Sequence, residues 1–370
     1  MNVGLHNQRA RGGRQVELDI AKGIAVLLMI CVHVQEVLSH SAVQHSLFGN
    51  IVEFVTGFPA APLFMLVMGV GTVYSRRQDA GYAIGRGASL LLMAYLLSAA
   101  RGYIPWSLGI KLGLLAQDAV PYGDVVQSLL EVDILHFAGL CFILIGVLRA
   151  ARVPWRAYPA VGLVLGGLNY LVRWVSAGQP RLDSILGLLW GASKTSYFPF
   201  LSWAMHPMVG VAFGHVLKAS SDKRRLYLQS SLAGCVVFLI AMYVSGFRFM
   251  YYIGVPEEHA YVYYHQDLIA NAVNGSLALV WLCVVYFLQG TLPAAVRQRL
   301  LYWSRELTAI YVIHWILIGW SVLLISFNQL MFWQTILAMA VVVVAADRIA
   351  AAYADWTGRR REAKAIAAGR

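Results

Sequence analysis

Long apolar stretches separated by short polar segments recur along the whole chain. Ten of them have about the 20 residues that a helix needs to cross a bilayer core of roughly 30 Å. We expect these spans near residues 17–38, 51–74, 84–102, 128–148, 157–175, 196–217, 226–245, 266–288, 305–326 and 331–352. The first stretch is too long, and too many others follow it, for a cleaved signal peptide. The pattern therefore predicts an all-α polytopic membrane protein.

The composition supports this class. Hydrophobic residues make up 59% of the 370 residues and charged residues only 13%, whereas a soluble domain has roughly 45–50% apolar and 25% charged residues. No soluble domain interrupts the spans. We expect one transmembrane domain over residues 1–356, followed by a basic cytoplasmic tail over residues 357–370.

The distribution of Lys and Arg predicts the orientation. With a cytoplasmic N-terminus, 22 of the 29 basic residues fall in the inner segments. The six in the outer segments are Arg101, Lys111, Arg173, Arg181, Lys194 and Arg248. This imbalance favours both termini in the cytoplasm of a multi-pass membrane protein. The net charge of +11 then reflects topology and attraction to anionic membrane lipid, and we expect no nucleic-acid partner.

The first span carries the most informative polar pattern. At about 100° per residue, Asp19, Lys22, His33 and Glu36 fall within an arc of roughly 100° on one helix face. Ionisable side chains at membrane depth cost roughly 2.5–3.5 kcal/mol on insertion scales, so they usually face a protein interior or an aqueous cavity. This face is a candidate site. The alternative is an Asp19–Lys22 ion pair near a helix end, with His33 bonded to a neighbouring helix.

Five segments in order resemble the transmembrane acyltransferases. Residues 14–33, RQVELDIAKGIAVLLMICVH, are similar to the opening signature "R…LDxxRGxA…M…(H/N)" of that superfamily. It includes the bacterial branch of the heparan-α-glucosaminide N-acetyltransferase-like proteins and, more distantly, the acyltransferase-3 family. The other four segments resemble later helices of the first group, and they are residues 61–70, 133–140, 197–214 and 310–315.

The resemblance implies a multi-pass acyltransferase of the cell inner membrane that moves an acetyl group from cytosolic acetyl-CoA to a sugar or glycolipid at the outer face. Such a reaction modifies polysaccharides and needs neither a metal nor ATP. The expected partners are membrane lipid, acyl-CoA and the glycan acceptor. The oligomeric state stays open, a homo-oligomer included.

Acyl transfer requires a base or nucleophile and donors for the developing oxyanion. We expect His33 and His45 in this catalytic role, because histidine can do either job near neutral pH. His45 precedes Phe58-Pro59 at the distance of the family's reactive histidine, although the Trp-Asn-Gly of the eukaryotic enzymes is missing. The alternatives are a structural intramembrane histidine at position 33 and a solvated loop histidine at position 45.

The anionic part of the donor calls for basic groups on the inner side. The expected donor-binding residues are Asp19, Lys22, Arg76, Arg77 and Arg86. Lys22 stands where the family usually has Arg, which keeps the charge but loses the bidentate fork. Arg76 and Arg77 have an alternative role as simple topology determinants.

The acceptor site is expected among polar and aromatic groups of the outer half. The candidate substrate-binding residues are Glu36, Tyr197, Tyr264 and His314. The outer segment from 247 to 265, with Glu257, Glu258 and His259, is dense in aromatic residues, for which an interfacial aromatic belt is the alternative. A second departure from the family is His136, which stands where Gln is common.

Two other functional classes use similar residues. A proton-coupled membrane transporter also carries buried Asp, Lys and His, but its discriminating feature is an inverted repeat with broken helices, and the sequence shows none. A non-catalytic scaffold leaves the polar face of the first span unexplained. The acyltransferase therefore accounts best for the sequence.

Overall fold

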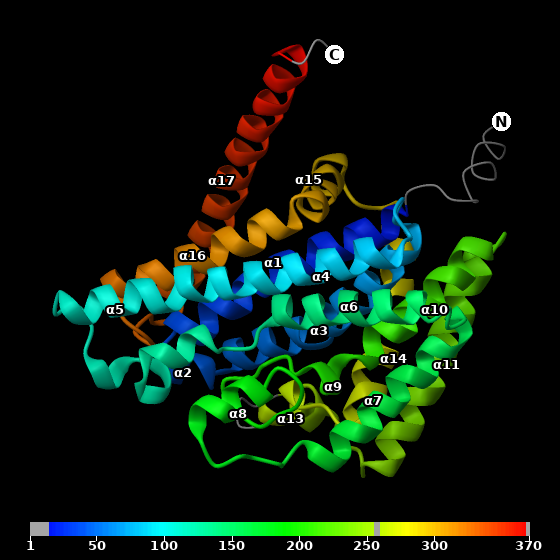
Figure 1. The fold of residues 1–370 in the computed structure, drawn as a ribbon, viewed down its shortest axis with the longest axis horizontal. Helices are drawn as coiled ribbons and strands as arrows, with labels where there is room; N and C mark the ends of the chain where they lie inside the picture. Colours follow the sequence, from blue (N-terminus) through cyan, green and yellow to red (C-terminus); the bar gives the residue numbers. More distant parts are fainter. Residues whose placement is uncertain (1–14, 255–259, 368–370) are drawn as a thin grey trace.

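The computed structural model describes residues 15–254 and 260–367, and this part of the chain contains helices but no β-strand (Figure 1). The predicted loop residues Glu257, Glu258 and His259 lie outside the described residues. The helices are α1 (Val16–Leu38), α2 (Ser41–Gln44), α3 (Leu47–Tyr74), α4 (Ala80–Ser98), the π-helix η1 (Ala99–Tyr103), α5 (Ile104–Lys111), α6 (Ile134–Ala150), α7 (Tyr158–Val172), α8 (Pro180–Leu186), α9 (Phe200–Trp203), α10 (Met205–Ala219), α11 (Lys223–Val244), α12 (Phe249–Tyr252), α13 (Ala260–Tyr264), α14 (Leu268–Leu288), α15 (Ala294–Arg305), α16 (Leu307–Ile325) and α17 (Phe332–Ala367).

Eight helical segments of the described chain are long and apolar enough to cross a membrane. Two more predicted spans correspond to α6 and α7, which are shorter, with 17 and 15 residues. The prediction of an all-α polytopic membrane protein is confirmed. The last predicted span corresponds to α17. This helix continues without a break to Ala367, so no change of secondary structure marks the predicted domain boundary after residue 356.

The third predicted span, residues 84–102, ends too early. The helix runs from Ala80 to Lys111, because α4 passes through η1 directly into α5. Arg101 was expected in an outer segment, and that expectation is wrong: it lies in η1 with only 5% of its surface exposed. Apolar residues continue on both sides of it, so the membrane-spanning segment does not stop at the charge.

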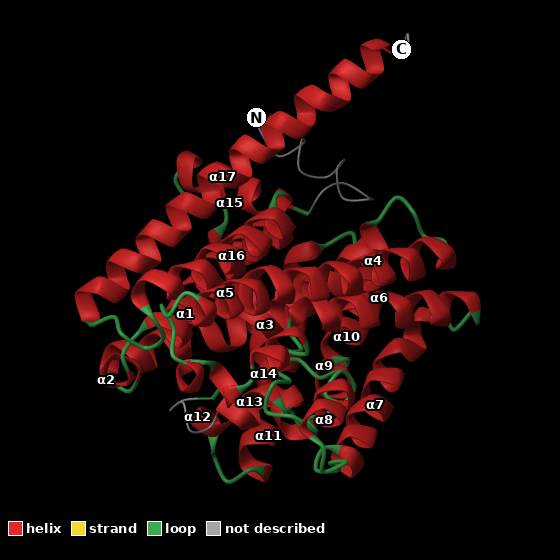
Figure 2. Cartoon of the chain, turned by 60° about the vertical axis from the view of Figure 1, so that its left-hand side comes forward, coloured by secondary structure: helices red, strands yellow, loops and turns green. Residues whose placement is uncertain are grey.

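Helix α1 occupies the centre of the bundle. It packs against α3, α14, α15, α16 and α17, while α4 packs along α6, and α10 packs along α3. Figure 2 shows the same arrangement from a second direction. In both views the C-terminal part of α17 projects beyond the other helices. Neighbouring helices therefore surround α1, while the side chains of its polar face stay partly exposed at Asp19, Lys22 and His33 and exposed at Glu36.

The two ends of the bundle differ, and we name them by their content. The basic end holds the start of α1 and the loops 75–79, 151–157 and 220–222, and the opposite, cavity end holds the loops 39–46 and 112–133. Because the long helices alternate in direction, the start of α1 and the far end of α17 both belong to the basic end (Figure 1). Its cytoplasmic orientation stays a prediction.

Candidate functional site

A cavity of about 580 Å³ opens within the cavity end of the bundle. It is lined by α1, α3, η1, the loop 112–133, the segment before α9, α13 and α16. Its carboxyl groups come from Glu36, Glu53, Asp118, Glu131 and Asp133, and the single Lys or Arg among the described lining residues is Arg101. The cavity thus has an excess of carboxyl groups and several aromatic residues in its walls, a combination typical of a ligand site with a few oriented polar groups.

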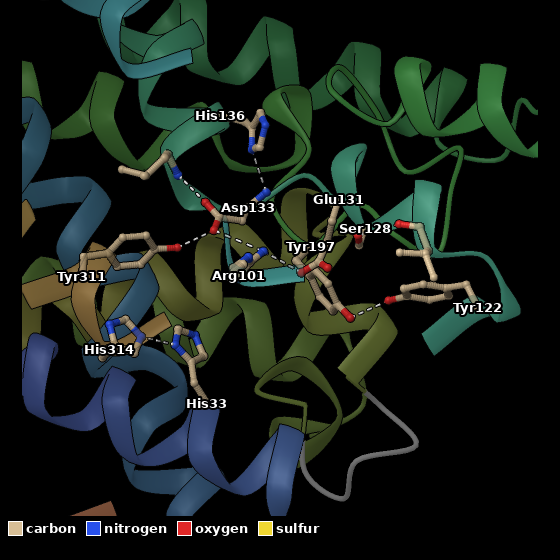
Figure 3. A network of polar contacts seen from close by, with 12 residues as sticks. His33, Arg101, Tyr122, Ser128, Glu131, Asp133, His136, Tyr197, Tyr311 and His314 are labelled. Carbon is tan, nitrogen blue, oxygen red and sulfur yellow. Dashed lines mark hydrogen bonds and ion pairs between the residues drawn. The ribbon is translucent and has the colours of Figure 1, made fainter. Parts of the chain in front are cut away.

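His33 lies on the cavity wall and is bonded from behind by a second histidine. His33 Nδ1 lies 2.9 Å from His314 Nε2, and His314 Nδ1 lies 3.1 Å from the carbonyl oxygen of Ile310 (Figure 3). A carbonyl oxygen only accepts, so His314 donates from Nδ1 and, when neutral, accepts at Nε2. His33 then donates from Nδ1. Its Nε2 is left as the proton acceptor of the ring.

The structure places His314 apart from the other expected substrate-binding residues. The side chain is completely buried and stands behind His33, and it does not belong to the cavity wall. In this structure its hydrogen bonds go to His33 and Ile310. Its contacts suit it to hold the ring of His33 in one orientation and one tautomer.

The Trp315 ring contacts both His33 and the buried Arg101 of the cavity. The Trp315 ring stacks on the His33 ring with 4.1 Å between centroids, and the Arg101 guanidinium carbon lies 4.0 Å from the Trp315 centroid. Arg101 Nη2 lies 2.8 Å from Glu131 Oε1 and 3.5 Å from Asp133 Oδ2. Burial raises the pKa of the Glu131 carboxyl above its ordinary value of 4.5, and the Arg101 charge offsets this only in part. One guanidinium thus serves two buried carboxyl groups.

Asp133 is oriented by its position at the start of α6. Its Oδ1 accepts from the Leu135 backbone N–H at 2.7 Å, and its Oδ2 accepts from the Tyr311 hydroxyl at 2.5 Å (Figure 3). His136 Nδ1 accepts from the Asp133 backbone N–H, which completes a capping box. His136, where the family commonly has Gln, therefore acts here as part of a helix cap.

Three of the expected substrate-binding residues do meet in the cavity, namely Glu36, Tyr197 and Tyr264. The Tyr264 hydroxyl donates to Glu36 at 3.0 Å, and the Tyr197 hydroxyl lies 2.6 Å from that of Tyr122. Burial raises the pKa of the Tyr197 phenol, so the hydroxyl keeps its proton at neutral pH. These groups offer hydrogen bonds and aromatic faces to a ligand.

His45 is not brought to this site. It ends the short helix α2 with an exposed side chain, and its Nδ1 lies 2.7 Å from the carbonyl oxygen of Ser41. It does not belong to the cavity lining. The two histidines expected to share the reaction are therefore separated in this structure, and only His33 has the cavity position.

The expected donor-binding residues lie at the basic end. Lys22 pairs with Asp19 at 2.8 Å, and Asp19 also accepts from Ser304 of α15 at 2.9 Å. The Asp19–Lys22 ion pair is thus present, as the structural alternative expected. Of the arginines, Arg76 is exposed, Arg77 lies over the Tyr82 ring, and Arg86 lies over the Phe142 ring.

Sequence reasoning missed two central residues of the cavity, Arg101 and Glu131. The available signal was a charge embedded in apolar sequence, since the apolar residues from 90 to 110 run past Arg101. Glu131 carried no comparable signal, because it lies in a loop whose path across the bundle follows from tertiary contacts.

The comparison with known protein families now bears on this geometry. No curated protein matches the chain. A family model for the heparan-alpha-glucosaminide N-acetyltransferase catalytic domain matches residues 14–256, which is more than half of the chain. The matched part contains His33, Arg101 and Asp133, whereas Tyr311, His314 and Trp315 lie beyond it. The chain belongs to the family of heparan-alpha-glucosaminide N-acetyltransferase catalytic domains.

Proposed function

We propose that this membrane acetyltransferase transfers the acetyl group of acetyl-CoA to an amino group of a sugar or glycolipid in the cavity, with His33 as general base. The family supports the reaction class and favours an enzyme over a transporter. The observation that carries the proposal is the His314–His33 pair, because it leaves a proton acceptor on the cavity wall.

The reaction needs few groups. A general base works within about 2.6–3.2 Å of the proton that it removes, and an acceptor lying in the cavity can come that close to Nε2 of His33. The acceptor nitrogen attacks the thioester carbonyl carbon while His33 takes its proton. The carbon–sulfur bond then breaks, and the leaving sulfur takes up the proton from His33.

The charge of the cavity supports an amine as the acceptor. Five carboxyl groups and a single guanidinium line the cavity. This excess of acidic groups attracts a cationic amino sugar. The Tyr264 and Tyr197 rings and hydroxyls suit a sugar, since they combine an apolar face with a polar edge. The ammonium group gives up one proton to solvent water before attack, and the neutral amine is then the nucleophile.

The distribution of charge also supports a cytoplasmic origin for the acetyl donor and an outer location for the acceptor. The basic residues at the basic end favour the cytoplasm there, which directs the cavity end to the outer face. A donor from the cytoplasm meets Lys22 first, together with Arg76, Arg77 and Arg86. His33 lies about 16 Å farther along α1 at 1.5 Å per residue, so the donor has to reach along the helix for its thioester to arrive there.

The direct test uses the purified protein in proteoliposomes with acetyl-CoA labelled in the acetyl group. We expect acceptor-dependent release of CoA thiol and a labelled amide on a glucosamine-terminated glycolipid. The glucose-terminated glycolipid serves as the matched acceptor control. Absence of acetyl transfer to any amino-sugar acceptor contradicts the proposed reaction.

Orientation is tested separately by reporters. A reporter fused after Arg370 should read as cytoplasmic, and one inserted at Gly178, in the loop between α7 and α8, should read as external. The opposite result places the cavity on the cytoplasmic side and contradicts transfer from a cytoplasmic donor to an acceptor at the outer face.

A further inference from the structure

Arg101 has an environment that ion pairing alone does not explain. It lies in η1, a π-helical turn inside a membrane-spanning segment, and 5% of its surface is exposed. Such turns occur frequently at functional sites, and a charge within the membrane is costly unless it serves a purpose. Arg101 also lines the cavity. Its position therefore calls for a functional explanation.

The guanidinium is only partly satisfied. Nη2 bonds Glu131 at 2.8 Å and approaches Asp133 at 3.5 Å, whereas Nη1 is buried and has no hydrogen-bond partner among the described residues. A buried donor without an acceptor costs about 1–3 kcal/mol, and more when it is charged. A ligand atom that accepts from Nη1 recovers this cost.

The donor lies close to the proposed base. Arg101 and His33 both pack against the ring of Trp315, at 4.0 and 4.1 Å from its centroid. Acyl transfer requires a point about 3 Å from both the base and the oxyanion donor, where the reacting group can sit. These contacts hold Arg101 and the His33 ring within about 8 Å of each other on the same cavity, and a reacting amine and carbonyl group placed between them can span that separation.

We propose that Arg101 is a catalytic residue whose Nη1–H donates to the oxygen of the acetyl carbonyl during transfer. This inference rests on the proposed function. As the acceptor nitrogen bonds to the carbonyl carbon, the π electron pair moves to oxygen, and Arg101 stabilises the resulting oxyanion while His33 takes the proton. When the pair returns, the carbon–sulfur bond breaks, the sulfur leaves with its electron pair, and His33 returns the proton to it.

The same nitrogen atom has a second use, which is to bind an anionic group of the acceptor. The two uses differ in kinetics. An interaction made only in the transition state lowers kcat when it is lost, whereas an interaction made equally in the ground state raises KM. A kinetic separation of the two constants therefore decides between them.

The test is Arg101→Lys, which keeps the charge and one donor for Glu131 but loses the planar fork. The matched control is Arg173→Lys. Arg173 also pairs with a carboxylate, Asp267 at 3.3 Å, and packs over aromatic rings, but it does not line the cavity. We expect Arg101→Lys to lower kcat by about 10²–10³-fold with KM for both substrates within about threefold, and Arg173→Lys to leave both constants unchanged.

Two kinetic results overturn the inference while the wild-type protein still transfers acetyl groups. One is a kcat of Arg101→Lys within about threefold of wild type. Another is a raised acceptor KM at unchanged kcat, which assigns Nη1 to an anionic acceptor group. If the wild-type protein itself transfers no acetyl group, the proposed function fails instead.

A measurement on the wild-type protein covers the case in which Arg101→Lys does not fold. The probe is the dithioester analogue of acetyl-CoA, in which sulfur replaces the carbonyl oxygen and accepts a hydrogen bond poorly. We expect the enzyme to discriminate against it at least about tenfold more than the uncatalysed aminolysis does. Equal discrimination in the two reactions shows that no donor serves the carbonyl oxygen and overturns the inference.

Discussion

The two ends of helix α1 present similar polar residues in opposite environments. At the basic end, Asp19 pairs with Lys22, and the buried Glu17 pairs with Lys223 of α11 at 3.2 Å and accepts from the Tyr227 hydroxyl at 3.0 Å. At the cavity end, His33 and Glu36 line an open volume. Helix α1 thus carries paired polar groups at one end and cavity-lining polar groups at the other.

This difference separates polar groups that stabilise the fold from polar groups that are able to bind a ligand. A buried carboxylate such as Glu17, whose charge is met by Lys223 and whose oxygen accepts from Tyr227, has little left for a ligand, and loss of its partner leaves an uncompensated charge. A polar atom without a protein partner on a cavity-lining residue has bonding capacity left, as Nη1 of Arg101 and Nε2 of His33 do. The polar pattern of α1 alone does not distinguish the two cases. Substitutions at either end test the comparison.

The largest expected effect is that of His33→Ala on transfer. Loss of the base should lower kcat by about 10²–10⁴-fold while the protein still binds the donor. His45→Ala, at an exposed position outside the cavity, should stay within about twofold of wild type. Both are measured by acetyl-CoA turnover with matched amounts of folded protein.

Equal losses in His33→Ala and His45→Ala indicate that the two histidines act as a unit, and that the loop holding His45 moves to the cavity during the reaction. A His33→Ala variant with normal turnover removes the base from the mechanism altogether.

Lys223→Met tests the closed cluster and should act on stability. It leaves Glu17, which is 3% exposed, without its counter-charge, so we expect the free energy of unfolding to fall by about 3 kcal/mol. Turnover per folded molecule should not change, because the cluster lies at the opposite end from the cavity. The measurement is a denaturant titration in mixed micelles.

The control for this substitution is Lys218→Met, at an exposed position at the end of α10. It should leave the unfolding transition in place. A Lys223→Met protein that is stable but inactive indicates that the basic end takes part directly in transfer.

Gly319→Ala and Gly23→Ala place the same added methyl group at the two ends. A Cβ at Gly319 would meet the Arg101 carbonyl oxygen at 1.9 Å, and one at Gly23 would meet the Leu300 carbonyl oxygen at 2.4 Å. Each should destabilise the protein by about 1–3 kcal/mol through overpacking. Only Gly319→Ala should also lower kcat, because it displaces the π-helix that carries Arg101.

Turnover and the free energy of unfolding are measured on the same preparations of Gly319→Ala and Gly23→Ala. A matching loss of kcat in Gly23→Ala contradicts the separation of the two ends. Gly71→Ala, in α3 with open space around the added methyl group, should change neither quantity.

The smallest effects are expected for the proposed donor contacts. Lys22→Ala and Arg86→Ala should each weaken CoA binding by up to about 1 kcal/mol, and less at high salt, because exposed charges are screened. Arg181→Ala, in the short helix α8 that follows α7 at the cavity end, is the control. Calorimetric titration of CoA at two salt concentrations measures the difference, and an unchanged affinity in both variants removes these residues from the donor site.

The sequence by itself determined the class of the fold and part of the site. Long apolar runs predicted the helices, since a segment of about 20 apolar residues has few alternatives to a membrane-spanning helix. The positions of His33 and Glu36 on one face of α1 also followed from helical periodicity. The motifs predicted the family, which the family model confirms.

Tertiary structure alone decided which polar groups are closed and which are open. His33 meets His314 across 281 residues of sequence, and Arg101 meets Glu131 and Trp315 only when η1, the loop 112–133 and α16 come together. Helical periodicity assigned Asp19 and His33 to one site. In the structure Asp19 accepts a hydrogen bond from Ser304 of α15, whereas His33 lines the cavity. The physical reason is that a side chain's burial and partners depend on neighbouring elements, which local sequence patterns do not specify.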